Sequence, residues 1–126
     1  MSFDVFLQGF AGGKAATGRP EAAVQVLLPY MVGAPNNGYV RVQLPDGEAD
    51  VYGVGNSSLM VNHAAGEQIW ELVVAVATAA AWVIIPVGCP TCIVDASHAD
   101  ELPDELRANV ILIHTGPQLL QAILRS

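Results

Sequence analysis

The sequence has few basic side chains. Its 126 residues include five lysines and arginines against 12 aspartates and glutamates, for a formal net charge of −7. The basic residues are scattered along the chain, at Lys14, Arg19, Arg41, Arg107 and Arg125. Because a nucleic-acid ligand requires clustered cations that neutralise its phosphates, this composition argues against nucleic acid as a direct partner. A negative net charge instead repels anionic membranes and steers basic proteins toward the chain, so a basic protein partner is expected.

No charged side chain occurs between Leu72 and Val94. A run of this length is sufficient to span a bilayer, which takes about 20 apolar residues. Pro86, Gly88 and Pro90 interrupt its second half, however, and no lysine or arginine flanks either end to set an orientation. We therefore expect no membrane contact, and interpret the run as a buried helix that leads directly into a buried strand.

Only two cysteines are present, Cys89 and Cys92, which are too few for a disulfide framework. The N-terminus lacks the basic segment and apolar stretch of a secretory signal. The protein is accordingly expected to be cytoplasmic, with both cysteines as thiols. With 52% apolar and 13% charged residues, the composition is typical of a compact fold. The length suits a single globular domain over residues 1–126.

The pattern of apolar residues predicts an α+β fold. Alternation predicts strands at residues 3–10, 39–44, 48–54, 59–61, 82–87 and 109–113. Helical spacing and capping residues predict helices at residues 20–30, 65–81 and 116–125. Small and flexible residues predict a loop at residues 11–18. The expected order is β-α-β-β-β-α-β-β-α, with a mainly antiparallel sheet packed by helices.

Two local signals are specific, and one helix is unusual. The Pro-Asp-Gly segment at residues 45–47 lies between two alternating stretches and predicts a tight hairpin turn. Thr115, followed three residues later by Gln118, predicts a helix N-terminus with a capping box. The helix at 65–81 has only a narrow polar stripe, so it either packs on two sides or forms an oligomer interface. A homo-oligomeric structural domain, such as a homodimer, is therefore one alternative.

Cys89 and Cys92 form a C-x-x-C motif, which is the main candidate for redox or metal chemistry. A redox pair needs its first cysteine at a helix start, where the dipole lowers the thiol pKa, whereas Ile93 and Val94 favour a strand. A metal site needs further ligands, such as His98, although the spacing is not that of a standard zinc motif. Otherwise the cysteines are small buried hydrophobic residues in a turn. No cofactor is expected, and the alternative thiol-redox or metal site consists of Cys89, Cys92 and His98.

Two sequence patterns resemble motifs of enzymes but differ from them at required positions. The segment 9–14 ends in Gly-Lys after a predicted strand, as a phosphate-binding loop does. However, Gln8 occupies the position of the first glycine and Ala15 replaces the hydroxyl that holds magnesium. Ser57 and Ser58 lack the glycine pattern of a nucleophile elbow. No catalytic residue is assigned, and the chain is expected not to be an enzyme.

The densest charge in the chain follows the uncharged run. Four carboxylates flank a Leu-Pro pair in a predicted surface turn, and a fifth lies shortly before them. Solvated charge is one interpretation. The other is a docking surface, in which an apolar anchor is surrounded by carboxylates that meet lysine or arginine side chains of a partner. The predicted partner-binding residues are Asp95, Asp100, Glu101, Leu102, Asp104 and Glu105.

Three segments carry a resemblance to known proteins. They are the opening MSFDVFLQ, the hairpin segment GEADVY at residues 47–52, and the block WVIIPVGCPTC at 82–92 together with Leu102-Pro103. These segments resemble small uncharacterised bacterial proteins that are similar in size and acidity to immunity proteins of polymorphic toxin systems, which block a cognate toxin by binding it. The resemblance implies no catalytic residue. The expectation is a non-enzymatic, immunity- or antitoxin-like inhibitor of a basic partner such as a toxin.

Overall fold

The computed structural model describes residues 4–125. Within that range the chain forms nine strands, three α-helices and three short 3-10 helices. The strands are β1 (Val5–Ala11), β2 (Lys14–Ala16), β3 (Met31–Asn36), β4 (Tyr39–Leu44), β5 (Gly47–Tyr52), β6 (Ser58–Asn62), β7 (Val83–Pro86), β8 (Thr91–Ile93) and β9 (Val110–Leu112). The helices are α1 (Pro20–Leu27), α2 (Gln68–Ala80), α3 (Gly116–Leu124), η1 (Leu28–Tyr30), η2 (Ala96–Glu101) and η3 (Asp104–Leu106).

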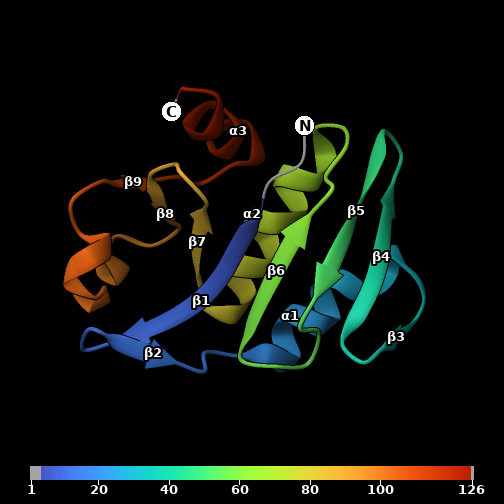
Figure 1. The fold of residues 1–126 in the computed structure, drawn as a ribbon, viewed down its shortest axis with the longest axis horizontal. Helices are drawn as coiled ribbons and strands as arrows, with labels where there is room; N and C mark the ends of the chain where they lie inside the picture. The colour runs from blue at the N-terminus through green and yellow to red at the C-terminus, as the bar shows by residue number, and fades with distance from the viewer. Residues whose placement is uncertain (1–3, 126) are drawn as a thin grey trace.

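The nine strands of residues 4–125 belong to one twisted sheet (Figure 1). Eight follow the order β3-β4-β5-β6-β1-β7-β8-β9, and β2 pairs with the end of β1. Among the described strands, the pairs are antiparallel except for β8 and β9, which are parallel. The prediction of a mixed fold with a mainly antiparallel sheet packed by helices is therefore confirmed.

The predicted element order lacks three strands. β2 and β3 lie in segments rich in alanine, glycine and proline, where no alternation marks a strand, and pairing with a neighbouring strand determines their conformation. β8 has only three residues, too few for a periodic signal. The predicted hairpin of β4 and β5 and the following strand β6 are present. Residue 3, where the first strand was expected to begin, lies outside the described residues.

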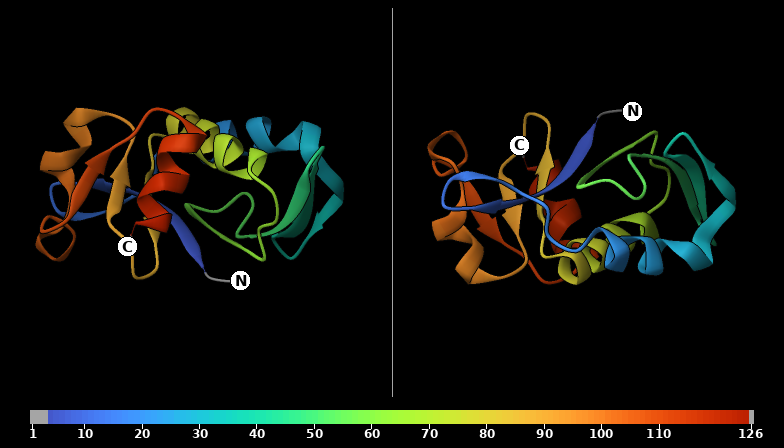
Figure 2. Two further views of the ribbon diagram at one scale, coloured as in Figure 1. Left: turned by 90° about the horizontal axis from the view of Figure 1, so that it is seen from above. Right: turned by 90° about the horizontal axis from the view of Figure 1, so that it is seen from below.

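The uncharged run folds as a helix followed by a strand, as expected. α2 ends at Ala80, and the next residue, Ala81, has a left-handed φ of 60° that turns the chain directly into β7. α2 packs on the sheet and against both α1 and α3, so elements of the same chain bury its apolar surface (Figure 2). The exposed residues of α2 fall in the predicted polar stripe. Among residues 4–125, none of the helices combines the length and apolar character that a bilayer crossing requires.

The two faces of the sheet are covered differently. The three α-helices pack on one face, where Leu7, Val42 and Val51 are at most 1% exposed. On the other face, η2 and η3 cover the end formed by β7, β8 and the last residues of β1, where Leu102 packs against Val83. The rest of that face is formed by β4, β5, β6 and the first part of β1, and none of the described helices lies over it (Figure 1). We call it the open face.

Candidate functional site

The acidic segment, residues 95–105, contains η2 and the start of η3. It lies beside the β1–β2 hairpin, at the opposite end of the sheet from β3 (Figure 1). Asp95 begins η2, and its Oδ1 accepts hydrogen bonds from the Ser97 N–H at 2.9 Å and the Ser97 hydroxyl at 2.8 Å. These two bonds lower the pKa of Asp95 below its ordinary value. Asp95 therefore stabilises the helix start in addition to carrying charge.

Glu101 and Leu102 attach the acidic segment to the sheet. The Glu101 carboxylate accepts a hydrogen bond from the Gly12 N–H, and its carbonyl accepts one from the Gly13 N–H at 3.0 Å. Leu102 is 0% exposed and packs against Val83 and Ile93. This corrects the expectation that Leu102 contacts a partner, because its side chain instead buries apolar surface at this end of the sheet.

Four of the predicted partner-binding residues are exposed carboxylates: Asp95, Asp100, Asp104 and Glu105. Arg107 is the neighbouring cation, but its Nε donates to the Leu102 carbonyl at 2.9 Å and its Nη2 to the Asp100 carbonyl at 3.0 Å. Its Nε is 3.8 Å from Asp104 Oδ1. Within residues 4–125, the side chains of Asp100 and Glu105 have neither a hydrogen bond nor an ion pair. Arg107, together with Lys14 on the adjoining β1–β2 hairpin, offsets part of the charge of the five carboxylates, and the acidic segment remains net negative.

Asp50, which sequence reasoning missed, is a buried carboxylate on the open face. It is 7% exposed, and its Oδ1 accepts a hydrogen bond from the Tyr39 hydroxyl at 2.7 Å. Arg41 Nε lies 3.4 Å from Oδ1, and His63 Nδ1 lies 3.1 Å from Oδ2. Burial alone raises the pKa of Asp50, but the hydrogen bond from Tyr39 and the charge of Arg41 outweigh it, so the pKa is lowered. The carboxylate therefore stays ionised at neutral pH.

We call Asp50 and the three side chains that contact it, Tyr39, Arg41 and His63, the Asp50 group. This group is better suited to holding side chains in place than to catalysis. An aspartate that orients a histidine is one part of a hydrolytic triad, but a triad also needs a nucleophile bonded to that histidine. In the described part of the chain, no hydroxyl or thiol hydrogen-bonds to His63. Asp50 does hold the Tyr39 hydroxyl, and the Tyr39 ring lies 5.1 Å from the Tyr52 ring, centroid to centroid. The carboxylate therefore fixes a pair of aromatic rings on the surface of the sheet.

Cys89 and Cys92 are both free thiols, and Cys89 is half-buried whereas Cys92 is buried. Cys92 lies in strand β8 and is 0% exposed; burial, with a smaller contribution from Cys89, raises the pKa of Cys92 to about 11. A thiol with so high a pKa is protonated at neutral pH and is a poor nucleophile. His98 belongs to η2, on the opposite side of the sheet from the Cys92 side chain. In residues 4–125, His, Cys, Asp and Glu side chains do not gather in threes that could hold a metal, so Cys89, Cys92 and His98 form no metal site.

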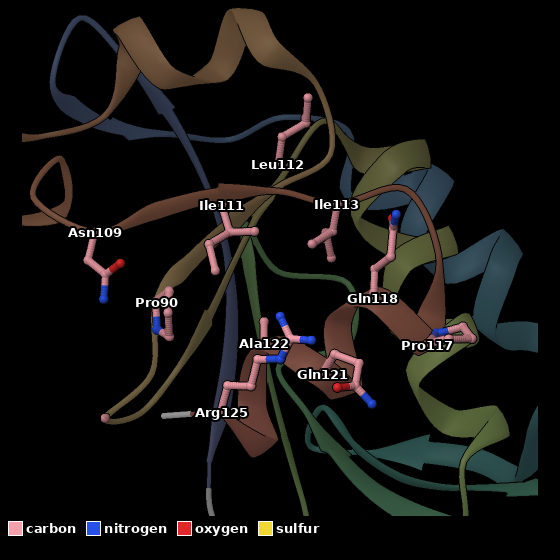
Figure 3. Close-up of a pocket in the computed structure, with 11 residues that line it drawn as sticks. Pro90, Asn109, Ile111, Leu112, Ile113, Pro117, Gln118, Gln121, Ala122 and Arg125 are labelled. Atoms are coloured by element: carbon pink, nitrogen blue, oxygen red, sulfur yellow. The ribbon is translucent and has the colours of Figure 1, made fainter.

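A cavity of about 570 Å³ lies between α3, β9 and the turn that precedes β8. Ile111 and Ile113 contribute apolar surface from β9 and the residue that follows it (Figure 3). Gln121 and Ala122 line the cavity from α3, and Arg125 lines it from the residue that caps this helix. Among the described residues that line it, none carries a carboxylate, imidazole, thiol or hydroxyl group. The described part of its wall therefore offers no side chain that commonly acts as a general acid, a general base or a nucleophile. Its mainly apolar lining is typical of a binding pocket.

No protein-family model, curated protein or solved structure matches the chain.

Proposed function

We propose that the protein is a non-enzymatic binding domain that docks an acidic surface on a basic partner protein. The observation that carries the proposal is the net negative charge of the acidic segment. It holds five carboxylates, and the hydrogen bonds of Arg107 go to backbone carbonyls. Such a field raises the rate of association with a cationic surface and disfavours anionic ones.

The composition of the other candidate sites supports binding over catalysis. In residues 4–125, the cavity beside α3 has no side-chain acid, base or nucleophile in its wall. The buried thiol of Cys92 is protonated, and no described hydroxyl or thiol is bonded to the histidine beside Asp50. The resemblance to immunity proteins of toxin systems agrees with a role in which the partner is a toxin, bound in the cytoplasm.

The test begins with affinity capture from a lysate of the native host at low ionic strength. The bait is the wild-type protein, and the test variant is Asp100→Asn/Glu105→Gln, which removes two exposed charges that form no bonds in the described chain. The matched control is Glu21→Gln/Glu67→Gln, which removes the same charge from the starts of α1 and α2. Each captured protein is then purified and its affinity for all three chains is measured at two salt concentrations.

The expected result is a basic protein whose affinity falls with added salt and falls further in the Asp100/Glu105 variant than in the control. The variant Cys89→Ala should bind as the wild type does, since the thiol has no part in the contact. Captured proteins that are acidic, or that bind both double variants equally, would contradict the proposal. A catalytic turnover that Cys89→Ala abolishes would favour the thiol alternative instead.

A further inference from the structure

Five side chains form a continuous apolar row across the open face. Met60 on β6 pairs with Tyr52 on β5 and with Phe6 on β1, and Phe6 pairs with Ile85 on β7. Tyr39 on β4 extends the row, since its ring lies 5.1 Å from that of Tyr52. With strands about 4.8 Å apart, five neighbouring strands make the row about 19 Å long. We call Tyr39, Tyr52, Met60, Phe6 and Ile85 the apolar row.

The apolar row is accessible along most of its length. Phe6 is 41% exposed and Tyr52 is 37% exposed, and the other three members are half-buried. Single exposed apolar side chains are ordinary, but a contiguous strip of this kind marks a contact surface. Tyrosine, phenylalanine and methionine are also enriched in the centres of protein interfaces. The Tyr39 ring is already fixed through its hydroxyl by Asp50, so a partner that packs on it loses less conformational entropy.

Acidic groups border the apolar row. A parallel row on the same face contains Arg41, Asp50, Asn62 and Asp4: Asp50 pairs with Arg41 and Asn62, and the Asn62 side chain donates to Asp4 Oδ1 at 3.4 Å. The one cation in this row, Arg41, lies against Asp50 and Glu48. The border alongside the row is therefore negative.

The acidic segment lies at one end of the same face. Ile85, the last member of the apolar row, packs against the cluster of Val83, Ile93 and Leu102 that holds the acidic segment in place. The row and the segment are thus continuous through Ile85. An apolar centre with a charged border is the usual anatomy of a protein interface.

We propose that the open face is the docking surface for the basic partner, with the apolar row at the centre of the contact and the acidic segment at its rim. This inference rests on the proposed function and adds the location and chemistry of the contact. Arginine side chains suit both parts of the surface, because a guanidinium packs on tyrosine and phenylalanine rings and pairs with carboxylates. A second copy of the chain fits less well, since each copy carries a net charge of −7 and a twofold contact would bring like-charged rims together.

The experiment uses a synthetic arginine nonamer as the probe and a glutamate nonamer as its control. Each peptide is titrated into the isotopically labelled protein at low ionic strength, and amide shifts are followed by NMR. The arginine nonamer should shift amides of β1, β5 and β6 most strongly, and the glutamate nonamer should shift none. The variant Phe6→Ala/Tyr52→Ala should weaken binding roughly 10-fold. The control Leu28→Ala/Leu124→Ala, which removes exposed apolar side chains from η1 and α3, should leave binding unchanged.

The outcomes separate the docking surface from the proposed function. If the arginine nonamer shifts only amides of the acidic segment, and binds the Phe6→Ala/Tyr52→Ala variant as tightly as the wild type, the proposed docking surface is wrong. The recognition of a basic partner by the acidic segment would then remain. If it shifts no amide at all, the recognition of a basic partner is wrong, and the docking surface with it. Sedimentation that reveals a wild-type dimer dispersed by Phe6→Ala/Tyr52→Ala would assign the open face to self-association and also overturn the proposal. The shift map of the wild type decides the question even where the double variant fails to fold.

Discussion

The face of the sheet that the three α-helices cover, here called the covered face, carries different side chains from the open face. The covered face carries aliphatic residues such as Leu7, Val42 and Val51, which are almost fully buried beneath the helices. The open face carries aromatic rings, a buried carboxylate and its polar partners. Burial of apolar area is the main source of folding free energy, so the covered face determines stability. The side chains of the open face are therefore available for recognition.

The largest difference is expected between two neighbouring residues of β1. Leu7→Ala should lower the free energy of unfolding by about 2–5 kcal/mol, because it leaves a cavity in a closed core. Phe6→Ala, on the opposite face of the same strand, should cost only about 1 kcal/mol, because the ring is already partly solvated. Urea denaturation of the two variants measures both values. Equal losses would mean that the open face is covered in solution.

A smaller loss is expected from the buried carboxylate of the open face. Asp50→Asn should lower the free energy of unfolding by about 1–3 kcal/mol, because the ionic contact with Arg41 is lost and hydrogen bonds to Tyr39 and His63 are weakened. Tyr39→Phe removes the donor of the shortest of these bonds. The double variant should lose less than the sum of the two single losses, since each change breaks the same hydrogen bond. Strict additivity would show that the bond contributes nothing.

The contribution of Asp50 should depend on pH. Its pKa is lowered in the folded protein, so its stabilising effect is complete above the ordinary aspartate pKa of about 3.9 and is lost as the pH falls through the lowered folded value. The stability difference between wild type and Asp50→Asn should therefore be constant above about pH 5 and shrink below about pH 4. Urea titrations across this range measure it. A difference that grows as the pH falls would have the wrong sign for an ionised carboxylate.

The smallest effect on stability is expected at the rim of the open face. Asp100→Asn/Glu105→Gln should raise the melting midpoint slightly at low ionic strength, because it relieves repulsion among the carboxylates. The increase should disappear at high salt, since exposed charges are screened. Thermal melts at two salt concentrations test this. A loss of stability would indicate that these carboxylates have a structural role, as Asp95 and Glu101 do.

Sequence patterns predicted the elements that depend on nearby residues. The hairpin of β4 and β5 follows from the turn chemistry of residues 45–47. The start of α3 follows from Thr115 and Gln118, which form the expected capping box. The buried helix followed by a strand was also predictable, because the absence of charge and the narrow polar stripe are local properties of α2.

Features that depend on distant residues were not predictable. The Asp50 group requires the register of β4 against β5, together with the placement of His63 after β6. The burial of Leu102 requires β7 and β8 to lie beneath the acidic segment. The apolar row combines residues from five strands. The sequence of any one strand indicates only that part of one of its faces is apolar, and it does not indicate which strands are neighbours. The candidate site is thus a property of the sheet pairing rather than of any one motif.

The turn between β4 and β5 is bonded to the start of α2, the main helix of the covered face. Asp46 Oδ2 accepts hydrogen bonds from the Glu67 and Gln68 N–H groups at 2.8 and 3.2 Å, so the turn caps the first residues of α2. A side chain at Gly47 would collide with the Ala65 carbonyl, so the turn and the segment before α2 are locked together. The hairpin is therefore joined to the start of the main core helix by three hydrogen bonds, since the Ala65 N–H also donates to the Glu48 carbonyl at 2.8 Å, and by one tight backbone contact. A ligand that displaced this hairpin would break the bonds from Asp46 to the first amides of α2, where amide hydrogen exchange would register the loss.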